Sequence, residues 1–299
     1  MKEKILITGA SGLLAKKLGK KLLDTNYNIN YLTTSKKDIS NKKFYWNYSK
    51  NHIDKEALQN VDHIIHLAGL NISKNWSSKN KELMFDSRVQ TSKLILNKCK
   101  ELNIKPKTFI SASAMGYYGF YQSGIKTEDS KPGTDWMANL CVAWERAADK
   151  FEQIGSRVIK LRLSVLIDSN SDILIKTCLS FKLGFGVVFG NGNQPFPWIH
   201  IDDVTKFIIY IIEKKNINGV FNLSSPQHIS HYEFIKTLQK IKYIKSKIIY
   251  APRFLMNLLF YRKKVLLFNE VILCTQKVKK TQFKWDYPEI GAALKQLLN

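Results

Sequence analysis

Met1-Lys-Glu-Lys-Ile-Leu-Ile-Thr-Gly-Ala-Ser-Gly-Leu-Leu-Ala-Lys-Lys-Leu-Gly-Lys20 is the stretch of this sequence that decides the fold. Its apolar run Ile5–Ile7 suits a buried parallel strand, and the leucines after the turn recur at helical spacing. Gly9 permits a sharp turn, Gly12 lets the backbone approach a ligand closely, and Ala15 is small enough for the helix to pack on the strand. The N-terminus of such a helix presents free N–H groups and a partial positive charge, which is where a pyrophosphate binds. We therefore predict a dinucleotide site rather than an ordinary strand–helix turn, with contacts from Gly9, Ala10, Ser11, Gly12, Leu13 and Leu14.

The composition is that of a folded protein without disulfides. At 299 residues with 44% hydrophobic content, the chain can bury one large core, or one core plus a small subdomain. The four cysteines, Cys99, Cys141, Cys178 and Cys274, lie far apart and form no C-x-x-C pair, so we expect neither a disulfide framework nor a metal site. The apolar N-terminus is interrupted by glycines and leads into a lysine-rich helix, unlike a signal peptide, and no stretch reaches about 18 uninterrupted apolar residues. We expect a cytoplasmic, soluble protein.

The net charge of +23 raises the question of an anionic partner. Nucleic acid and anionic membrane are both attracted to such a chain. The lysines are nevertheless dispersed, and no RNA- or DNA-binding signature is present. Attraction of an anionic cofactor explains the charge better. We therefore expect a small-molecule substrate and neither a dedicated nucleic-acid partner nor a membrane partner. A homodimer is the assembly to test.

The end of the second strand, residues 28–34, bears on the choice of cofactor. An NAD-specific site places Asp or Glu there to bind the ribose hydroxyls, whereas this chain has Thr33-Thr-Ser-Lys-Lys37. Hydroxyls and an ammonium group can hold a 2′-phosphate, which favours NADP(H) over NAD(H) with contacts from Thr33, Ser35 and Lys36. The alternative is a solvated polar turn.

Two further strands end in residues suited to the cofactor and the substrate. Residues 61–69 form a strand that closes with Leu67, Ala68 and Gly69 beside the cofactor, while His63 and His66 are expected to be structural. Residues 107–119 form a strand whose carboxyl end delivers Ser111, Ser113, Tyr117 and Tyr118. Carboxyl ends of strands carry the chemistry in open α/β sheets, so Ser111 is expected to contact the cofactor, as is Arg162 from the strand over 157–167.

The alternation of strands and helices predicts an α/β fold with a Rossmann-type, doubly wound parallel sheet and a small, mainly helical C-terminal cap. The expected domains are an NADP(H)-binding domain over residues 1–240 and a small domain over 241–299. Excursions near residues 165–200 are expected to contribute to the substrate site. The Gly/Pro-rich tract 183–197 is interpreted as an active-site loop, and it leads to His200, an acid/base candidate for which a structural role is an equal alternative.

Several motifs together resemble one family. They are Ile7-Thr-Gly-Ala-Ser-Gly-Leu13, His66-Leu-Ala-Gly69, Asp86-Ser-Arg-Val89, Ser111-Ala-Ser-Ala-Met-Gly-Tyr-Tyr-Gly119, Leu140-Cys-Val-Ala-Trp-Glu145, Gly190-Asn-Gly-Asn-Gln194, Trp198-Ile-His-Ile-Asp-Asp203 and the tail from Gln276 to Pro288. Over nearly the whole chain they resemble the extended short-chain dehydrogenase/reductase superfamily, in the atypical branch labelled "epimerase family protein". The resemblance implies a Rossmann fold, a nicotinamide cofactor and a C-terminal domain proper to that branch.

The chain departs from the superfamily at its catalytic pair. That pair is Tyr-x-x-x-Lys, roughly two dozen residues after the catalytic serine, and the lysine lowers the pKa of the phenol for proton transfer. Counting from Ser113 reaches Met137 and Cys141, and residues 136–144 contain neither tyrosine nor lysine. Arg88 also stands where the superfamily usually has asparagine. An unperturbed tyrosine, with a pKa near 10, is a poor base at neutral pH.

Two functions follow from these residues. In the first, the chain is an NADP(H)-dependent oxidoreductase or epimerase acting on a small carbonyl or sugar-like substrate. Ser113 then hydrogen-bonds the substrate oxygen, and Tyr118 or Tyr117 replaces the missing proton donor, with His200 as another acid/base candidate. In the second, the chain is a non-catalytic, NADP(H)-binding sensor whose C-terminal domain contacts a partner.

Overall fold

The computed structural model describes residues 2–120 and 122–298, without the side chains of residues 259–262 and 264. The chain divides into two compact units, each made of separate stretches. The sheet unit contains Met1–Ala114, Asn139–Arg162 and Thr205–Phe221, and the second unit contains Met115–Ala138, Leu163–Val204 and Asn222–Asn299. This division concerns packing and does not test whether a domain ends at residue 240, so that boundary stays a prediction.

The large sheet has the Rossmann arrangement that the sequence predicts. Its eight strands lie in the order β12-β8-β6-β5-β1-β2-β3-β4. The pairs from β6 through β5, β1 and β2 to β3 are parallel, and β4 is antiparallel to β3. The strands are β1 (Lys4–Thr8), β2 (Asn28–Thr33), β3 (Lys43–Asn47), β4 (His52–Ile53), β5 (His63–His66), β6 (Thr108–Ala114), β8 (Arg157–Leu163) and β12 (Gly219–Leu223).

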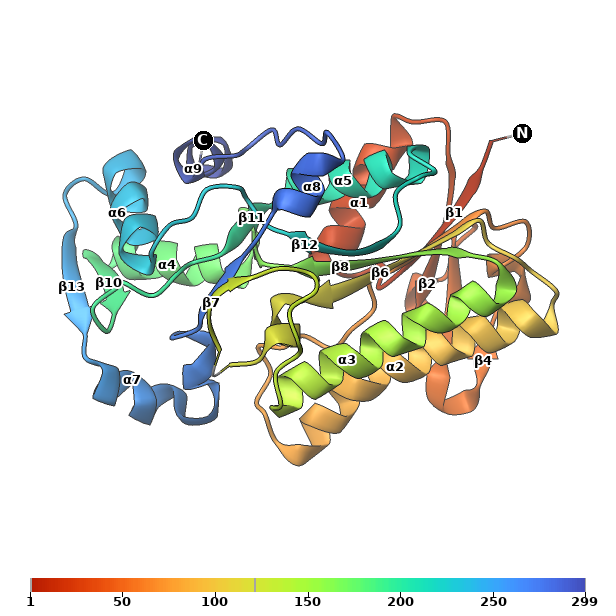
Figure 1. Cartoon of the computed structure of the whole chain (residues 1–299), viewed down its shortest axis with the longest axis horizontal. Coiled ribbons are helices and arrows are strands. Elements are labelled where there is room, and N and C mark those ends of the chain that lie inside the picture. Colours follow the sequence, from red (N-terminus) through yellow and green to blue (C-terminus); the bar gives the residue numbers. More distant parts are fainter. Residues whose placement is uncertain (1, 121, 299) are drawn as a thin grey trace. The chain divides into compact units, whose positions relative to one another are not determined.

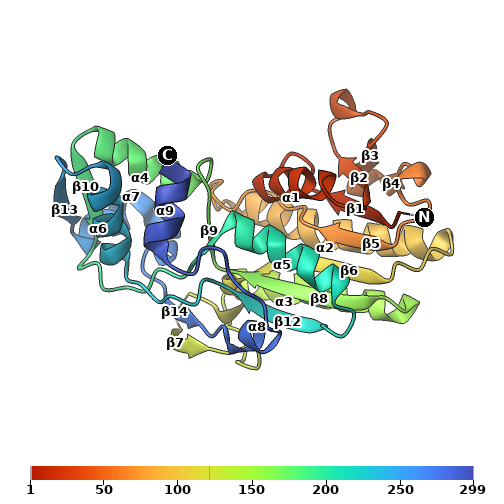
Figure 2. The same ribbon diagram turned by 90° about the horizontal axis from the view of Figure 1, so that it is seen from above.

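Helices cover both faces of this sheet, which makes it doubly wound. Figure 1 shows α1 and α5 on one face and α2 and α3 on the other, and the view from above in Figure 2 places α1 and α5 over the strands. These helices are α1 (Leu13–Leu23), α2 (Ser78–Glu101), α3 (Trp136–Asp149) and α5 (Ile201–Glu213). Short 3-10 segments connect the elements, at Lys36–Asp38, Tyr48–Lys50, Lys55–Ala57, Met115–Tyr118, Lys150–Ile154 and Tyr261–Leu266.

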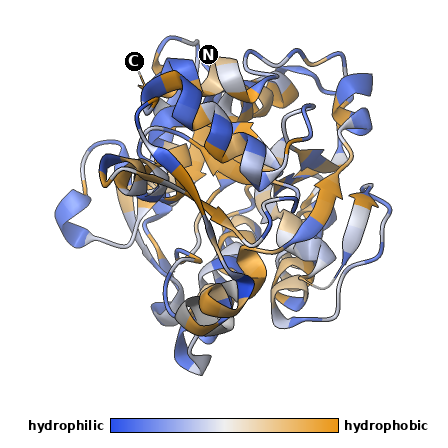
Figure 3. Ribbon diagram, turned by 90° about the vertical axis from the view of Figure 1, so that its left-hand side faces the viewer, coloured by the Kyte–Doolittle hydropathy of each residue, from blue (hydrophilic) through white to orange (hydrophobic). Residues whose placement is uncertain are grey.

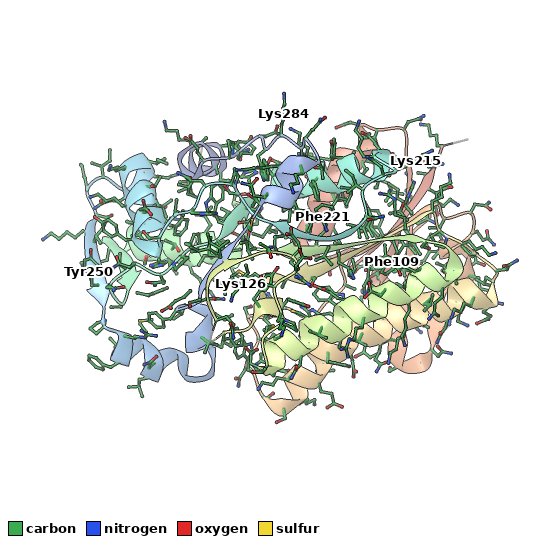
Figure 4. The ribbon with its side chains drawn as sticks, in the orientation of Figure 1. Phe109, Lys126, Lys215, Phe221, Tyr250 and Lys284 are labelled. Carbon is green, nitrogen blue, oxygen red and sulfur yellow. The ribbon has the colours of Figure 1, made fainter. Side chains whose placement is uncertain are left out.

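Apolar runs in the central strands form the core of the sheet unit. Ile5, Leu6 and Ile7 of β1 are fully buried, and most strand segments appear in hydrophobic colours in Figure 3. Phe109 of β6, labelled in Figure 4, stacks on Phe151 with ring centroids 3.6 Å apart. A strand buried on both faces reads as a continuous apolar run, which is why these strands could be predicted from the sequence.

The second unit combines short parallel strand pairs with helices. The pairs are β7 (Ser123–Lys126) with β14 (Glu270–Leu273), β9 (Val165–Ile167) with β11 (Trp198–His200), and β10 (Phe185–Phe189) with β13 (Lys247–Ala251). The helices are α4 (Asp172–Lys182), α6 (His231–Lys242), α7 (Arg253–Phe260), α8 (Gln276–Lys280) and α9 (Ile290–Leu298). The last sixty residues therefore hold strands β13 and β14 as well as the expected helices.

Several predicted element bounds need correction. The tract 183–197 is not a loop throughout, because residues 185–189 form β10. The predicted strand over 157–167 is divided into β8 and β9. Helix α2 begins at Ser78, because the Ser77 side chain accepts the N–H of Asn80 and caps the helix.

Within the part of the chain that the structure describes, no helix has both the length and the apolar character required to cross a bilayer. The four cysteines are all free thiols.

Candidate functional site

The turn from β1 into α1 lies where the strand order of the sheet reverses. Strand β1 sits between β2 and β5, so the connections that leave β1 and β5 run to opposite sides, and open α/β sheets bind ligands in the crevice at this point. Gly9 has a φ of +73°, and a Cβ built there would lie 3.0 Å from the Leu67 carbonyl oxygen and 3.1 Å from Ala68. The positive φ and the close approach of Leu67 and Ala68 both select glycine at this position.

The N-terminus of α1 has the properties of an anion site. Gly12 is the cap residue, with a φ of −70°, a ψ of 150° and no side-chain hydrogen bond, and its N–H donates to Gly9 O at 2.8 Å. Ser11 and Gly12 are exposed, and the first turn of the helix carries no acidic residue. The aligned peptide dipoles therefore present their positive end without a competing carboxylate.

A buried polar cluster fixes the ends of β1 and β5. The Thr8 Oγ1 atom accepts the N–H groups of Leu67 and Ala68, both at 3.0 Å. Its own proton is therefore donated to His66 Nδ1, 2.9 Å away, and the Nε2–H of His66 faces the Arg88 carbonyl oxygen at 3.2 Å. Burial lowers the pKa of His66 to about 4, so the imidazole is neutral at pH 7. His66 has the structural role that the sequence suggests, since it holds residues 67–69 beside the Gly9 turn.

The end of β2 bears the residues expected to contact a 2′-phosphate. The buried Thr33 hydroxyl oxygen accepts the Ser35 N–H at 3.2 Å and so shapes the turn. Lys36 is exposed, with its ammonium nitrogen 5.3 Å from the centre of the Tyr45 ring on β3. No carboxylate occurs in residues 33–37; the next acid along the chain is Asp38. The turn therefore offers hydroxyls and cations to an anion.

Arg88 of α2 places a cation beside the end of β5. Its guanidinium donates to Met84 O at 3.0 Å and to Leu70 O at 3.2 Å, and it lies 4.9 Å from the Trp144 ring. A Cβ at Gly69 would lie 2.8 Å from the guanidinium carbon, so a larger residue there would require the Arg88 side chain to shift. Burial lowers the pKa of Arg88, yet the group stays charged, and its Nε has no hydrogen-bond partner among the described residues.

Ser113 belongs to a buried charged network. Its hydroxyl donates to Glu145 Oε1 at 2.7 Å. The same carboxylate is held by Arg162, whose Nε lies 2.8 Å from Oε1 and whose Nη2 lies 2.9 Å from Oε2. The exposed fractions are 2% for Ser113, 6% for Glu145 and 2% for Arg162. Because its only proton is donated to Glu145, the Ser113 oxygen can only accept a hydrogen bond from any other group.

Two predicted cofactor contacts lie in or near this network. Arg162 binds the Glu145 carboxylate in the fork geometry that favours this pairing. Ser111 is fully buried, and its hydroxyl donates to the adjacent Ala112 carbonyl oxygen at 2.9 Å. Neither the Arg162–Glu145 pair nor the Ser111 hydrogen bond shows whether these residues contact a cofactor, so both contacts remain predictions.

Glu145 is the residue that the sequence analysis did not single out. It occupies the same face of α3 as the two positions where the superfamily has its catalytic pair, since Met137, Cys141 and Glu145 follow one another at intervals of four. Burial raises the pKa of the Cys141 thiol to about 12, so this side chain is neutral. A glutamate at this spacing after the two missing positions was the available signal.

The other acid/base candidates lie in the second unit and are held by internal hydrogen bonds. Tyr118 is fully buried, with its hydroxyl 2.6 Å from Asn222 Oδ1 and 3.0 Å from Thr127 O. Tyr117 is partly exposed and packs edge-to-face against Tyr118, with ring centroids 5.4 Å apart. Two acceptors already compete for the single proton of the Tyr118 hydroxyl.

His200 is also enclosed. Its Nδ1 accepts the Asp202 N–H at 3.1 Å, so its Nε2–H donates to Gln296 Oε1 at 3.1 Å. The ring lies 4.0 Å from that of Tyr287 and is fully buried. This arrangement joins β11 to the C-terminal helix α9, and the acid/base role of His200 stays a prediction.

The second unit contains a cavity of about 210 Å³ beside the Gly/Pro-rich tract. Its walls come from residues 193–197, the segment 224–230, Glu233 of α6 and the end of β14. The cavity has both polar and apolar walls, as expected of a site for a small organic molecule.

The sequence of this chain matches those of known proteins. The model of the NAD dependent epimerase/dehydratase family matches residues 5–224. The chain belongs to this family. An "epimerase family protein" of Staphylococcus aureus is 28% identical to it over 297 residues, and the match covers 98% of each chain. One of Staphylococcus haemolyticus is 29% identical over 305 residues, covering 99% of each.

Two solved structures share the fold. The human epimerase family protein SDR39U1, solved with NADPH, superimposes with a TM-score of 0.85 at 24% identity, covering 98% of each chain. The nucleoside-diphosphate sugar epimerase from Corynebacterium glutamicum gives a TM-score of 0.79 at 26% identity, covering all of this chain and 58% of that one. Both superpositions extend over the C-terminal portion of the chain as well as the residues that the family model matches.

Proposed function

We propose that this family member binds NADP(H) and is an oxidoreductase or epimerase for a small carbonyl or sugar-like substrate. The observation that carries the proposal is the open Gly9–Gly12 turn at the reversal of the strand order, followed by a helix N-terminus free of acids. A diphosphate fits the chemistry of this turn, because backbone N–H groups and the helix dipole both favour negative charge. The NADPH in the related human structure supports the same assignment.

The preference for NADP(H) over NAD(H) rests on the turn 33–37. The exposed Lys36, the Ser35 side chain and the absence of a carboxylate in this turn favour a 2′-phosphate over free ribose hydroxyls. When bound, the nicotinamide supplies the hydride donor or acceptor of the reaction.

The chain's own contribution to proton transfer is assigned to Ser113 and Glu145. The Ser113 oxygen accepts the proton of a substrate hydroxyl while its own proton passes to Glu145, with which it already shares a hydrogen bond. Arg162 holds the carboxylate in place through two hydrogen bonds, so Ser113 is oriented for this role before substrate binds. In the reducing direction the proton returns from Glu145 through Ser113 to the substrate oxygen. This pair replaces the Tyr-x-x-x-Lys pair, and Tyr118, Tyr117 and His200 are left as secondary candidates.

A non-catalytic sensor of NADP(H) is the second candidate. The neutral thiol of Cys141 and the enclosed hydroxyl of Tyr118 favour it, because neither position offers an ordinary proton donor. In that case the Ser113–Glu145–Arg162 network only stabilises the sheet unit.

Calorimetric titration with NADPH, combined with a screen of carbonyl compounds and nucleotide sugars for a change in NADPH absorbance, separates the two candidates. The enzyme proposal predicts binding and turnover, and Glu145→Gln is expected to reduce turnover by about 10²–10⁴-fold with NADPH affinity preserved within a few fold. NADPH binding without turnover on any compound favours the sensor. Absence of NADPH binding contradicts both.

A further inference from the structure

The second unit exposes a row of large aliphatic side chains. Ile175 and Leu179 of α4 are 50% and 57% exposed, and Leu183 directly after the helix is 73% exposed. Ile244, in the connection from α6 to β13, is 77% exposed. Single exposed leucines are common on protein surfaces, whereas a contiguous group of them marks an interaction site.

Hydrogen bonds and ring contacts place these residues on one surface. The end of α4 is tied to the connection that carries Ile244, because Lys247 N donates to Gly184 O at 2.9 Å and Ser246 Oγ donates to Phe181 O at 3.2 Å. The rings of Phe181 and Tyr243 stack with centroids 4.8 Å apart. Figure 1 shows α4, β10 and β13 together at one end of this unit.

Lysines lie among these aliphatic residues. Lys182, Lys242, Lys245 and Lys247 are all exposed, and Lys242 also donates to the Leu298 carbonyl oxygen at 2.6 Å. A cavity of about 330 Å³ opens between Ile175, Leu179, Lys182, Lys242 and Tyr243. We call the eight residues Ile175, Leu179, Lys182, Leu183, Lys242, Ile244, Lys245 and Lys247 the lysine–aliphatic surface.

Acidic residues are rare in the segments that form this surface, where Asp172 begins α4. The sequence contains no Asp or Glu in residues 173–201, which hold two lysines, or in residues 234–269, which hold seven lysines and two arginines. The lysines and arginines of these two stretches are therefore not compensated by any acidic residue within them. Such a distribution attracts an anionic surface and repels a cationic one.

The chemistry of the lysine–aliphatic surface decides between occupants. A second copy of the chain would bring like charges together, and nucleic acid would leave the aliphatic row exposed to water. An anionic bilayer suits both the aliphatic row and the lysines, because aliphatic side chains insert at the boundary of the acyl chains while lysines pair with phosphate groups.

We propose that the lysine–aliphatic surface binds the surface of a membrane that contains anionic phospholipid. The protein then docks reversibly, with the row from Ile175 to Ile244 at the level of the headgroups. The sequence alone led us to expect no membrane partner, because the row is assembled from α4 and the connection from α6 to β13, about sixty residues apart.

Co-sedimentation of the full chain with vesicles tests this proposal. We expect binding to vesicles of phosphatidylglycerol with phosphatidylcholine and none to phosphatidylcholine alone. Leu179→Ser with Leu183→Ser is expected to weaken binding by at least about tenfold through lost apolar insertion. Lys182→Glu with Lys245→Glu and Lys247→Glu is expected to weaken it by at least about tenfold and to remove its dependence on salt.

Matched control variants come from the sheet unit. Leu23 of α1 is 69% exposed beside Lys20 and Lys21, so Leu23→Ser tests a similar leucine elsewhere. Lys79→Glu with Lys93→Glu and Lys100→Glu, all exposed on α2, changes the net charge as much as the triple surface variant does. Both controls are expected to bind vesicles like the parent chain, and unchanged circular dichroism verifies that every variant is folded.

Failure to bind vesicles with phosphatidylglycerol at low salt overturns the proposal and points to an acidic protein as the occupant. Equal weakening in the controls and in the surface variants also overturns it, because adsorption would then follow total charge alone. None of these outcomes depends on cofactor binding or turnover.

Discussion

Removal of the Glu145 carboxylate is the sharpest structural test of the Ser113–Glu145–Arg162 network. Both charged groups are at least 94% buried, with 6% of Glu145 and 2% of Arg162 exposed, and two hydrogen bonds of 2.8 and 2.9 Å join them. Glu145→Ala leaves the Arg162 guanidinium buried without its carboxylate, which costs about 3–5 kcal/mol. Because about 1 kcal/mol shifts Tm by about 2–4 °C in a domain of roughly 150–250 residues, the expected fall in Tm is about 6–20 °C.

Thermal unfolding followed by circular dichroism measures this effect, with two controls. Glu101→Ala removes the carboxylate of an exposed pair with Lys98, and it is expected to leave Tm unchanged. Glu145→Leu with Arg162→Met removes both charges and is expected to recover much of the lost stability, because no unpaired charge remains. A Tm for Glu145→Ala within 2 °C of the parent, or a double variant as unstable as the sum of its single variants, would refute the reasoning.

Three further predictions follow from the site. Ser35→Asp with Lys36→Ala is expected to shift the ratio of NADPH to NADH affinity at least about tenfold toward NADH, because a phosphate partner is lost and a ribose acceptor is gained. Calorimetry measures both affinities, and an unchanged ratio counts against the 2′-phosphate assignment. The pKa of His66 is about 4 in the folded chain and 6.5 in the unfolded chain, so the unfolded state binds more protons between pH 4 and 6.5. The free energy of unfolding is therefore expected to fall by about 3 kcal/mol as the pH drops from 6.5 to 4. Urea titrations across this range should show a shallower fall in His66→Gln, and identical slopes would contradict the neutral buried imidazole. Ser113→Ala is expected to reduce turnover by about 10²–10⁴-fold, whereas Tyr118→Phe is expected mainly to lower Tm. The reverse pattern in rate and melting measurements would indicate that Tyr118 is the proton donor.

The parts of the fold that local sequence determines were predicted correctly. The Gly9–Gly12 turn needs only a strand, two glycines and a helix in succession, and each feature is visible within twenty residues. The role of His66 was likewise open to inference, because a histidine between apolar residues of a buried strand is more often held by hydrogen bonds than bound to a ligand.

The features that escaped prediction depend on contacts between distant residues. Glu145 and Arg162 meet because α3 packs against the sheet, and the spacing of Glu145 after positions 137 and 141 does not by itself identify Arg162 as its partner. Strand β10 was interpreted as loop because glycines and prolines are frequent around it, yet Phe185–Phe189 pairs with β13 about sixty residues later. Gly186 lets Phe181 of α4 pack against β10, since a Cβ at Gly186 would lie 2.5 Å from the Phe181 ring.

Calorimetric titration of NADPH into the parent chain and into Gly12→Asp tests the central claim most directly. The account predicts saturable binding to one site in the parent and no measurable binding in the variant, because a carboxylate at the N-terminus of α1 would occupy and repel the diphosphate. Equal affinity in the two proteins, with the variant folded by circular dichroism, would contradict the assignment of the dinucleotide site to the Gly9–Gly12 turn.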